Sequence, residues 1–198
     1  MGLKYDRLSR QLRVARAGSV FVTPWYQVGL FACGYAALSV VATSGARSDV
    51  FSIAVGATLA AYLIYLSMID IAQFRLPDAL TLPLLAVGLA LAAWGGVQLL
   101  AWHLISAGLG FGAFRGIGFL YERYRGVQGL GLGDAKFLAA AGAWFGAEPL
   151  ATLVLIAAVT ALSFVAISAA NGRVMSRSMR LPFGPFLAVG FWCVWLLA

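Results

Sequence analysis

Charge is what this sequence lacks most. Only 11% of its 198 residues are Asp, Glu, Lys or Arg, while 62% are hydrophobic. Soluble domains carry about a quarter charged residues, and a soluble core of this size could not hide so much apolar surface. We therefore expect an all-α membrane protein, a polytopic helical bundle with lipid as its main solvent.

Cysteine and histidine are almost absent as well, with two cysteines and one histidine in the whole chain. Cys33 and Cys193 lie far apart inside apolar stretches and form no CxxC pair. Such a pattern indicates neither a zinc site nor a disulfide framework, so we expect both cysteines to be small apolar fillers of helices. The sequence implies no metal and no other cofactor.

The net charge of +7 has a simpler explanation than nucleic-acid binding. Basic residues of membrane proteins gather in cytoplasmic loops and set the orientation of the chain. Five cations lie in residues 1–20, where Leu8, Leu12 and Ala15 share one face of a helical wheel. We predict that 1–20 is a retained amphipathic segment on the membrane surface, and that 21–198 form a single transmembrane domain.

Uncharged segments predict six to seven transmembrane helices, since one crossing needs about 20 residues. The run 79–114 is long enough for two spans, and Gly95, Gly96 and His103 mark the expected turn between them. The segment 135–147 is short for a crossing and begins next to charged residues. The candidates are 24–46, 50–69, two spans within 79–121, 135–147, 150–170 and 181–198.

The cations support this count. With a cytoplasmic N-terminus, 12 of the 14 lysines and arginines fall on the cytoplasmic side. Only Arg47 then faces outside, and Arg115 lies within a helix. The distribution predicts an N-in, C-out topology.

The same topology places two carboxylates on one side, because Asp70 and Asp134 each lie at the cytoplasmic end of an apolar helix. Ionisable groups at membrane depth are costly and therefore candidates for function. Peptide hydrolysis needs a base that activates water and an acid that protonates the leaving group. Two close carboxylates that share one proton can do both, so we predict a catalytic Asp70/Asp134 dyad.

The second aspartate belongs to a GxGD sequence. Gly131 and Gly133 flank Leu132 just before Asp134. We expect these glycines to allow unusual backbone angles and close approach of a substrate strand. GxGD alone is a weak motif, and its position opposite Asp70 gives it weight.

Three segments carry a resemblance to type IV prepilin peptidases. Residues 70–83 (DIAQFRLPDALTLP) look like the first aspartate motif of that family, and 129–146 (GLGLGDAKFLAAAGAWFG) look like its GxGD motif and following helix. Residues 181–188 (LPFGPFLA) look like the entry to its final helix. The family's catalytic aspartates map onto Asp70 and Asp134.

The resemblance implies an intramembrane aspartic endopeptidase in the bacterial inner membrane. Its substrates would be type IV prepilin-like or pseudopilin precursors, cut at the cytoplasmic face between a short basic leader and an apolar helix, typically after a glycine. Larger family members also carry a cytoplasmic cysteine cluster and an N-methyltransferase activity. This chain has short loops and no cysteine pair, so we expect peptidase activity only. The oligomeric state is not indicated.

Several neighbouring residues are predicted to support the site. Lys136 would stabilise the dyad anion or a substrate carboxylate, or else simply snorkel to the interface. Arg75 would anchor its loop or contact substrate, or else only help to set the topology. Asp78 is expected to cap the following helix rather than to take a direct part in catalysis. Pro185, with Pro182 and Gly184, is expected to shape a bend near the site.

Other functions remain open from the sequence alone. Asp70 and Asp134 could bind cations in a small coupled transporter, although neither an internal repeat nor polar residues at mid-membrane support this. The chain could be a catalytically inactive scaffold of a pilus system. It could also cleave other membrane proteins, as presenilin-like GxGD enzymes do.

Overall fold

The computed structural model describes residues 50–126, 130–171 and 181–197. The predicted amphipathic segment 1–20, the candidate helix 24–46 and Cys33 lie outside these residues. The described part of the chain is helical, with no β-strand. Its helices are α3 (Val50–Gln73), α4 (Asp78–Trp94), α5 (Val97–Arg125), α6 (Leu132–Phe145), α7 (Leu150–Ala170) and α8 (Gly184–Leu197).

Most of these helices follow the predicted segments. The long uncharged run is divided at Gly95 and Gly96, as predicted, and Gly96 has a φ of 107° that favours glycine. His103 is not part of this turn, because it lies inside α5 and its Nδ1 is 2.8 Å from the Ala143 carbonyl oxygen of α6. Helix α3 continues three residues past Asp70, and α6 begins two residues before Asp134 rather than after it.

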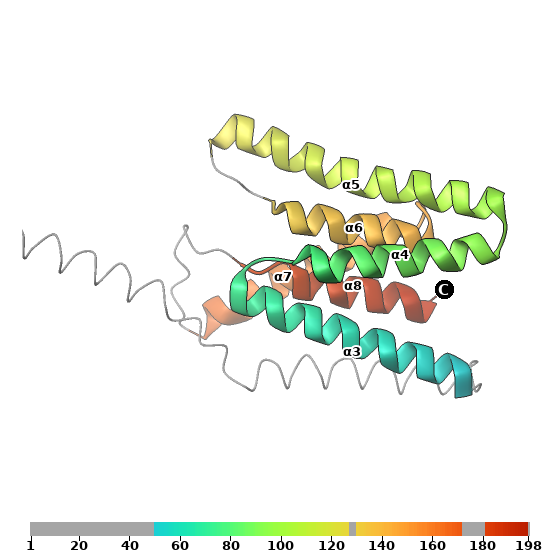
Figure 1. Cartoon of the computed structure of the whole chain (residues 1–198). Coiled ribbons are helices and arrows are strands. Elements are labelled where there is room, and N and C mark those ends of the chain that lie inside the picture. The colour runs from blue at the N-terminus through green and yellow to red at the C-terminus, as the bar shows by residue number, and fades with distance from the viewer. Residues whose placement is uncertain (1–49, 127–129, 172–180, 198) are drawn as a thin grey trace, which may run out of the picture.

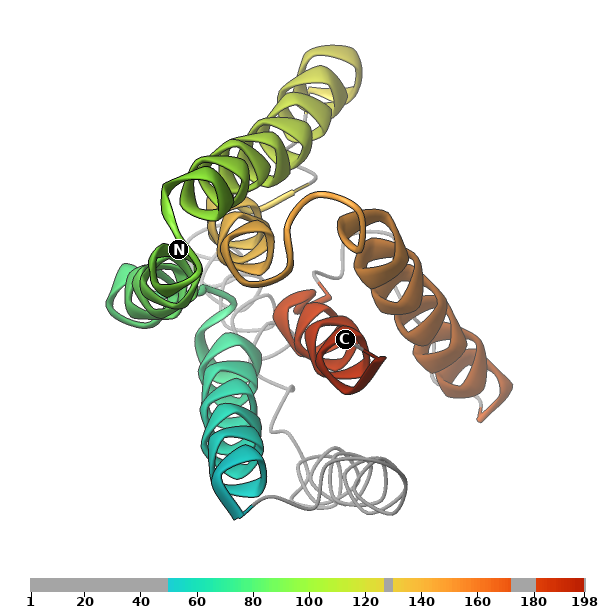
Figure 2. The ribbon, with the colours of Figure 1, turned by 90° about the vertical axis from the view of Figure 1, so that its right-hand side faces the viewer.

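Helix α6 is the centre of the bundle. It contacts α4, α5, α7 and α8, and Figure 2 shows it surrounded by the other helices. Small residues allow this close packing, as is common between membrane helices. A Cβ on Gly110 of α5 would lie 2.6 Å from the Leu138 carbonyl oxygen of α6, and a Cβ on Gly142 would collide with the Ser106 carbonyl of α5.

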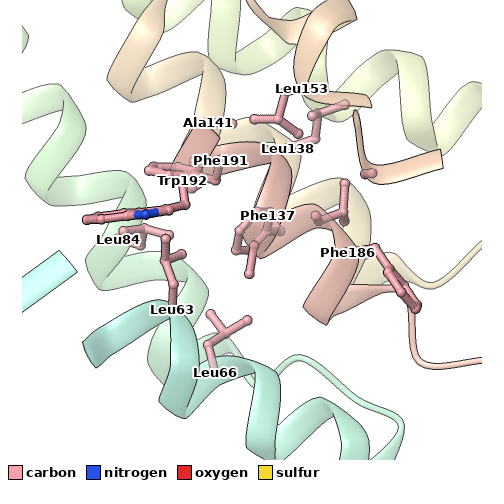
Figure 3. Packing of buried hydrophobic residues seen from close by; sticks show 14 of the residues in the cluster. Leu63, Leu66, Leu84, Phe137, Leu138, Ala141, Leu153, Phe186, Phe191 and Trp192 are labelled. Carbon is pink, nitrogen blue, oxygen red and sulfur yellow. The ribbon is translucent and has the colours of Figure 1, made fainter. Parts of the chain in front are cut away.

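The rest of the core is built from large apolar side chains where α8 packs against α3, α6 and α7. Phe137 of α6 and Phe191 of α8 are fully buried, with ring centroids 5.8 Å apart in an edge-to-face arrangement. Leu63, Leu66 and Leu153 are also fully buried, and Figure 3 shows these side chains converging between the helices. This core fixes α8 against α3 and α6.

The outer faces of the helices are apolar too. Leu109 and Ile117 of α5 and Leu155 and Leu162 of α7 are each more than half exposed. In the described part of the chain, residues 55–73 of α3 and the whole of α5 and α7 are long and apolar enough to cross a membrane. The sequence predicted six to seven spans, whereas three of the described helices have the length and composition of a membrane span.

One end of the bundle gathers the polar residues of interest. Figure 1 shows that α3 and α5 end, and α4, α6 and α8 begin, at the same end. Arg75, Arg123, Arg125 and Lys136 therefore lie at one end, as the predicted topology requires. We call it the dyad end, because Asp70 and Asp134 are both there.

Candidate active site

Asp70 lies in the last turn of α3 and is nearly inaccessible, with 4% of its surface exposed. The backbone N–H of Gly184 donates a hydrogen bond of 2.9 Å to its Oδ2. Gly184 is the first residue of α8, so Asp70 also faces the positive end of that helix dipole. A carboxylate buried among apolar helices thus has a donor from a segment 114 residues later in the chain.

Gly184 itself has no room for a side chain. A Cβ at this position would lie 2.7 Å from Asp70 Oδ2 and 2.9 Å from its Cγ. The sequence suggested only that Gly184 helps to bend the chain with Pro182 and Pro185, and its hydrogen bond to Asp70 was missed. A glycine between two prolines at a helix start was the available signal. Pro185, also predicted to shape this entry, is fully buried as the second residue of α8.

Asp134 lies in the first turn of α6, outside the three helices long enough to cross a membrane. It is half-buried, and the Gly131 N–H donates to its Oδ2 over 3.3 Å. Burial, and secondly the negative charge of Asp70, raise the pKa of Asp134 to about 7, while the Gly131 hydrogen bond acts in the opposite direction. The two carboxyl groups are therefore electrostatically coupled, and ionisation of one opposes ionisation of the other.

The glycines of the GxGD sequence act differently from the prediction. Gly131 has an ordinary extended conformation, with φ −73° and ψ 146°, and neither Gly131 nor Gly133 has a positive φ. The expectation of unusual backbone angles is wrong. Gly133 is instead needed for close packing, because a Cβ there would lie 2.8 Å from the Cβ of Leu76. It brings the loop after α3 against the start of α6, and so helps to bring Asp70 and Asp134 together.

An ion pair lies beside the two aspartates. Lys136 Nζ is 2.5 Å from Asp78 Oδ1, with 24% and 59% of the two side chains exposed. Lys136 therefore forms an ion pair with Asp78, which lies at the start of α4. Asp78 lies in the first helical turn, where a carboxylate suits the dipole, but the N-cap residue is Pro77 and no side chain makes a capping hydrogen bond. Arg75 is exposed in the loop between α3 and α4.

These groups can support acid–base chemistry. Asp70 and Asp134 supply two coupled carboxyls, and backbone N–H groups from two helix starts hold them. Among the described residues there is no cluster of three or more His, Cys, Asp or Glu that could hold a metal ion. Fold and site together define a helical membrane protein with a pair of acidic groups at one end of its bundle.

Comparison with known proteins identifies the family. Residues 57–166, which include both aspartates, match the sequence model of the Type IV leader peptidase family. The chain belongs to this family. Since three of its helices are also long and apolar enough to cross a membrane, it is a multi-pass membrane protein.

The relatives share a name. A prepilin leader peptidase/N-methyltransferase of Burkholderia pseudomallei (strain K96243) is 38% identical over 188 residues, which cover 95% of this chain and 59% of the relative. Proteins of the same name from Aeromonas hydrophila and Neisseria gonorrhoeae are 36% and 33% identical, covering 66% and 70% of this chain and 44% and 47% of the relatives. No solved structure matches with significance.

The chain thus spans between 44% and 59% of the length of these relatives. The relatives' name includes N-methyltransferase, so the comparisons do not support the prediction that this activity is absent.

Proposed function

We propose that this chain is an aspartic endopeptidase that cleaves type IV prepilin-like precursors with the Asp70/Asp134 dyad. The observation that carries the proposal is the position of both carboxyls at one end of an apolar helix bundle (Figure 1), each held by a backbone N–H from a helix start, where the charge of Asp70 helps to raise the pKa of Asp134. Family membership supports the peptide-bond chemistry and the class of substrate. Each relative is named a prepilin leader peptidase, and the match includes both aspartates.

The dyad would hold one proton between its two carboxyls near neutral pH. The ionised carboxylate removes a proton from water, and the resulting hydroxide attacks the scissile carbonyl. The protonated partner then donates its proton to the leaving amine. The pair ends with one proton, as it began, so the cycle needs no metal or cofactor.

Two further contacts would keep the carboxyls in position. The Gly184 N–H fixes Asp70 from α8, while the Gly131 N–H restrains Asp134 from its own helix start. We assign the Lys136–Asp78 pair a positioning role, because it joins the start of α6, which bears Asp134, to the start of α4, which follows Asp70. Neither member of the pair needs to touch the substrate in this proposal.

The proposed topology sets the dyad end in the cytoplasm and the bundle in the bacterial inner membrane. The cations at the dyad end support this orientation. The precursor would place its basic leader in the cytoplasm and its apolar helix in the bilayer, so that the bond between them meets the dyad. Asp78 and Lys136 then lie near the lipid headgroups, where a partly exposed ion pair is tolerated.

The test is a cleavage assay with the purified full chain in lipid nanodiscs. The probe is a precursor with a short basic leader ending in glycine, followed by an apolar helix of about 20 residues. Mass spectrometry would report loss of the leader, with Asp134→Asn as the matched control. Absence of cleavage by folded wild-type protein would contradict the proposal and favour the scaffold hypothesis.

The same assay separates the remaining alternatives. Adding a methyl donor tests our expectation of peptidase activity alone, because a methylated product would carry a higher mass. A cation-coupled transporter would give ion flux in sealed vesicles and no cleavage. Cleavage of unrelated membrane helices at similar rates would indicate the broader presenilin-like specificity.

A further inference from the structure

Phe74 has a backbone conformation that suits glycine much better. Its φ is 52°, and it is the one non-glycine residue with a positive φ among the described residues. It directly follows α3, and its N–H donates a hydrogen bond of 2.8 Å to the carbonyl oxygen of Asp70. Helices often end on a residue in this conformation, and that residue is usually glycine because a Cβ is crowded there.

The Phe74 side chain gains little from the core. It is 40% exposed, whereas Leu76, two residues later, is 6% exposed and packs against Gly133. The same short loop therefore contacts the glycine next to Asp134 and begins four residues after Asp70. An exposed aromatic ring thus belongs to the loop that follows α3 and contacts the start of α6, at a position where glycine would form a better turn.

Residues in unfavourable backbone conformations persist where they serve a ligand or a reaction. On the basis of the proposed function, we propose that Phe74 contacts the apolar segment of the precursor just after the cleaved bond. The ring would select a bulky apolar residue there, because aromatic side chains offer a large apolar surface with few rotatable bonds. Phe74 is thus assigned as a specificity residue, and the dyad performs the chemistry.

The test uses two variants and two precursors. Phe74→Gly removes both the ring and the backbone strain, while Phe74→Ala removes the ring and keeps the strain. The precursors differ only in the first residue after the cut, which is Leu in one and Ala in the other. Phe119→Ala is the matched control, since this ring is 56% exposed on α5 and is not part of the loop.

We expect both Phe74 variants to raise KM for the Leu precursor about tenfold, with kcat little changed, because an apolar contact is lost. For the Ala precursor the change should be less than about twofold. Phe74→Gly should also melt at a higher temperature than Phe74→Ala, since glycine accepts the positive φ. Phe119→Ala should leave both KM values near those of the wild type.

Three outcomes would overturn the inference. A Phe74→Gly variant that melts at a higher temperature but has an unchanged KM would show that Phe74 only terminates α3. Equal losses for both precursors would indicate a membrane anchor instead. Binding of a fluorescent Leu precursor to Asp134→Asn and to Asp134→Asn/Phe74→Gly gives a readout without cleavage, and equal affinities would contradict the contact. Lack of cleavage by the wild type contradicts the proposed function, so the two failures are distinguishable.

Discussion

The two aspartates occupy the same end of the bundle but are held in different ways. Asp70 is buried, and its backbone donor comes from a helix 114 residues later in the chain. Asp134 is half-buried, and its donor is Gly131, three residues earlier. The position of Asp70 therefore depends on the packing of the whole bundle, whereas that of Asp134 depends mainly on its own helix start. One reaction would thus rely on one global and one local contact.

Replacing either carboxyl should have the largest effect. We expect Asp70→Asn and Asp134→Asn each to reduce cleavage of the precursor by about a thousandfold or more, because one carboxyl cannot act as both base and acid. Initial rates by mass spectrometry, with circular dichroism to check folding, measure this. Substantial activity in a folded variant would remove that aspartate from the mechanism.

The second prediction separates the global contact from the local one. Gly184→Ala should lower kcat by about a hundredfold, since the added methyl group would displace the Asp70 carboxyl from its backbone donor. Gly131→Ala is the matched substitution at the other aspartate, where a Cβ would lie 3.2 Å from Asp134 Oδ2. It should lower kcat by less than about tenfold. Similar losses in the two variants would show that Asp134 depends on its donor as strongly as Asp70 does.

The third prediction concerns pH and Asp134. Its folded-state pKa of about 7 exceeds the ordinary value of 3.8, so folding favours the neutral carboxyl. The stabilising contribution is fully present below about pH 4 and is lost as the pH rises through 7. Asn has no charge to bury, so Asp134→Asn should melt at a higher temperature than the wild type at pH 8.

This difference should shrink as the pH falls towards 4. Thermal unfolding in detergent from pH 4 to 8 measures it, and Glu148→Gln, at an exposed carboxyl between α6 and α7, is the control. A melting-temperature difference that does not change with pH would show that Asp134 does not titrate in this range.

The smallest effect is expected for the ion pair beside the dyad. Lys136→Ala and Asp78→Ala should each reduce kcat about three- to tenfold, because the pair is partly exposed and only positions the two helix starts. The double variant should be little worse than either single one. The reversed pair, Lys136→Asp with Asp78→Lys, should recover part of the activity. A loss in Lys136→Ala as large as in the aspartate variants would place Lys136 in the chemistry.

The sequence predicted the helices well where hydrophobic runs have clear ends. The span 150–170 matches α7 because Pro149 and Asn171 bound an uninterrupted apolar run. The predicted span 135–147 begins three residues later than α6, since it was limited to the uncharged residues after Asp134, although a carboxylate suits a first helical turn. The two aspartates could be singled out as candidates because acidic groups are so rare in this chain.

The contacts around the aspartates could not be predicted in the same way. The donor to Asp70 is a backbone N–H, which every residue except proline possesses, so no side-chain pattern distinguishes Gly184. The partner of Lys136 is 58 residues away and depends on how α4 and α6 pack. The same holds for Gly133, whose close approach to Leu76 becomes visible only once the loop is in place.

The late position of Gly184 also has a consequence for biosynthesis. Helix α3 is synthesised long before α8 exists, and a ribosome needs roughly 6 to 23 seconds to add the 114 residues between Asp70 and its donor. During that interval Asp70 has no backbone N–H from α8 to hold its carboxyl. If Asp70 acts as proposed, a nascent chain would be unable to cut neighbouring membrane proteins until α8 has been inserted, so the order of synthesis would delay activation.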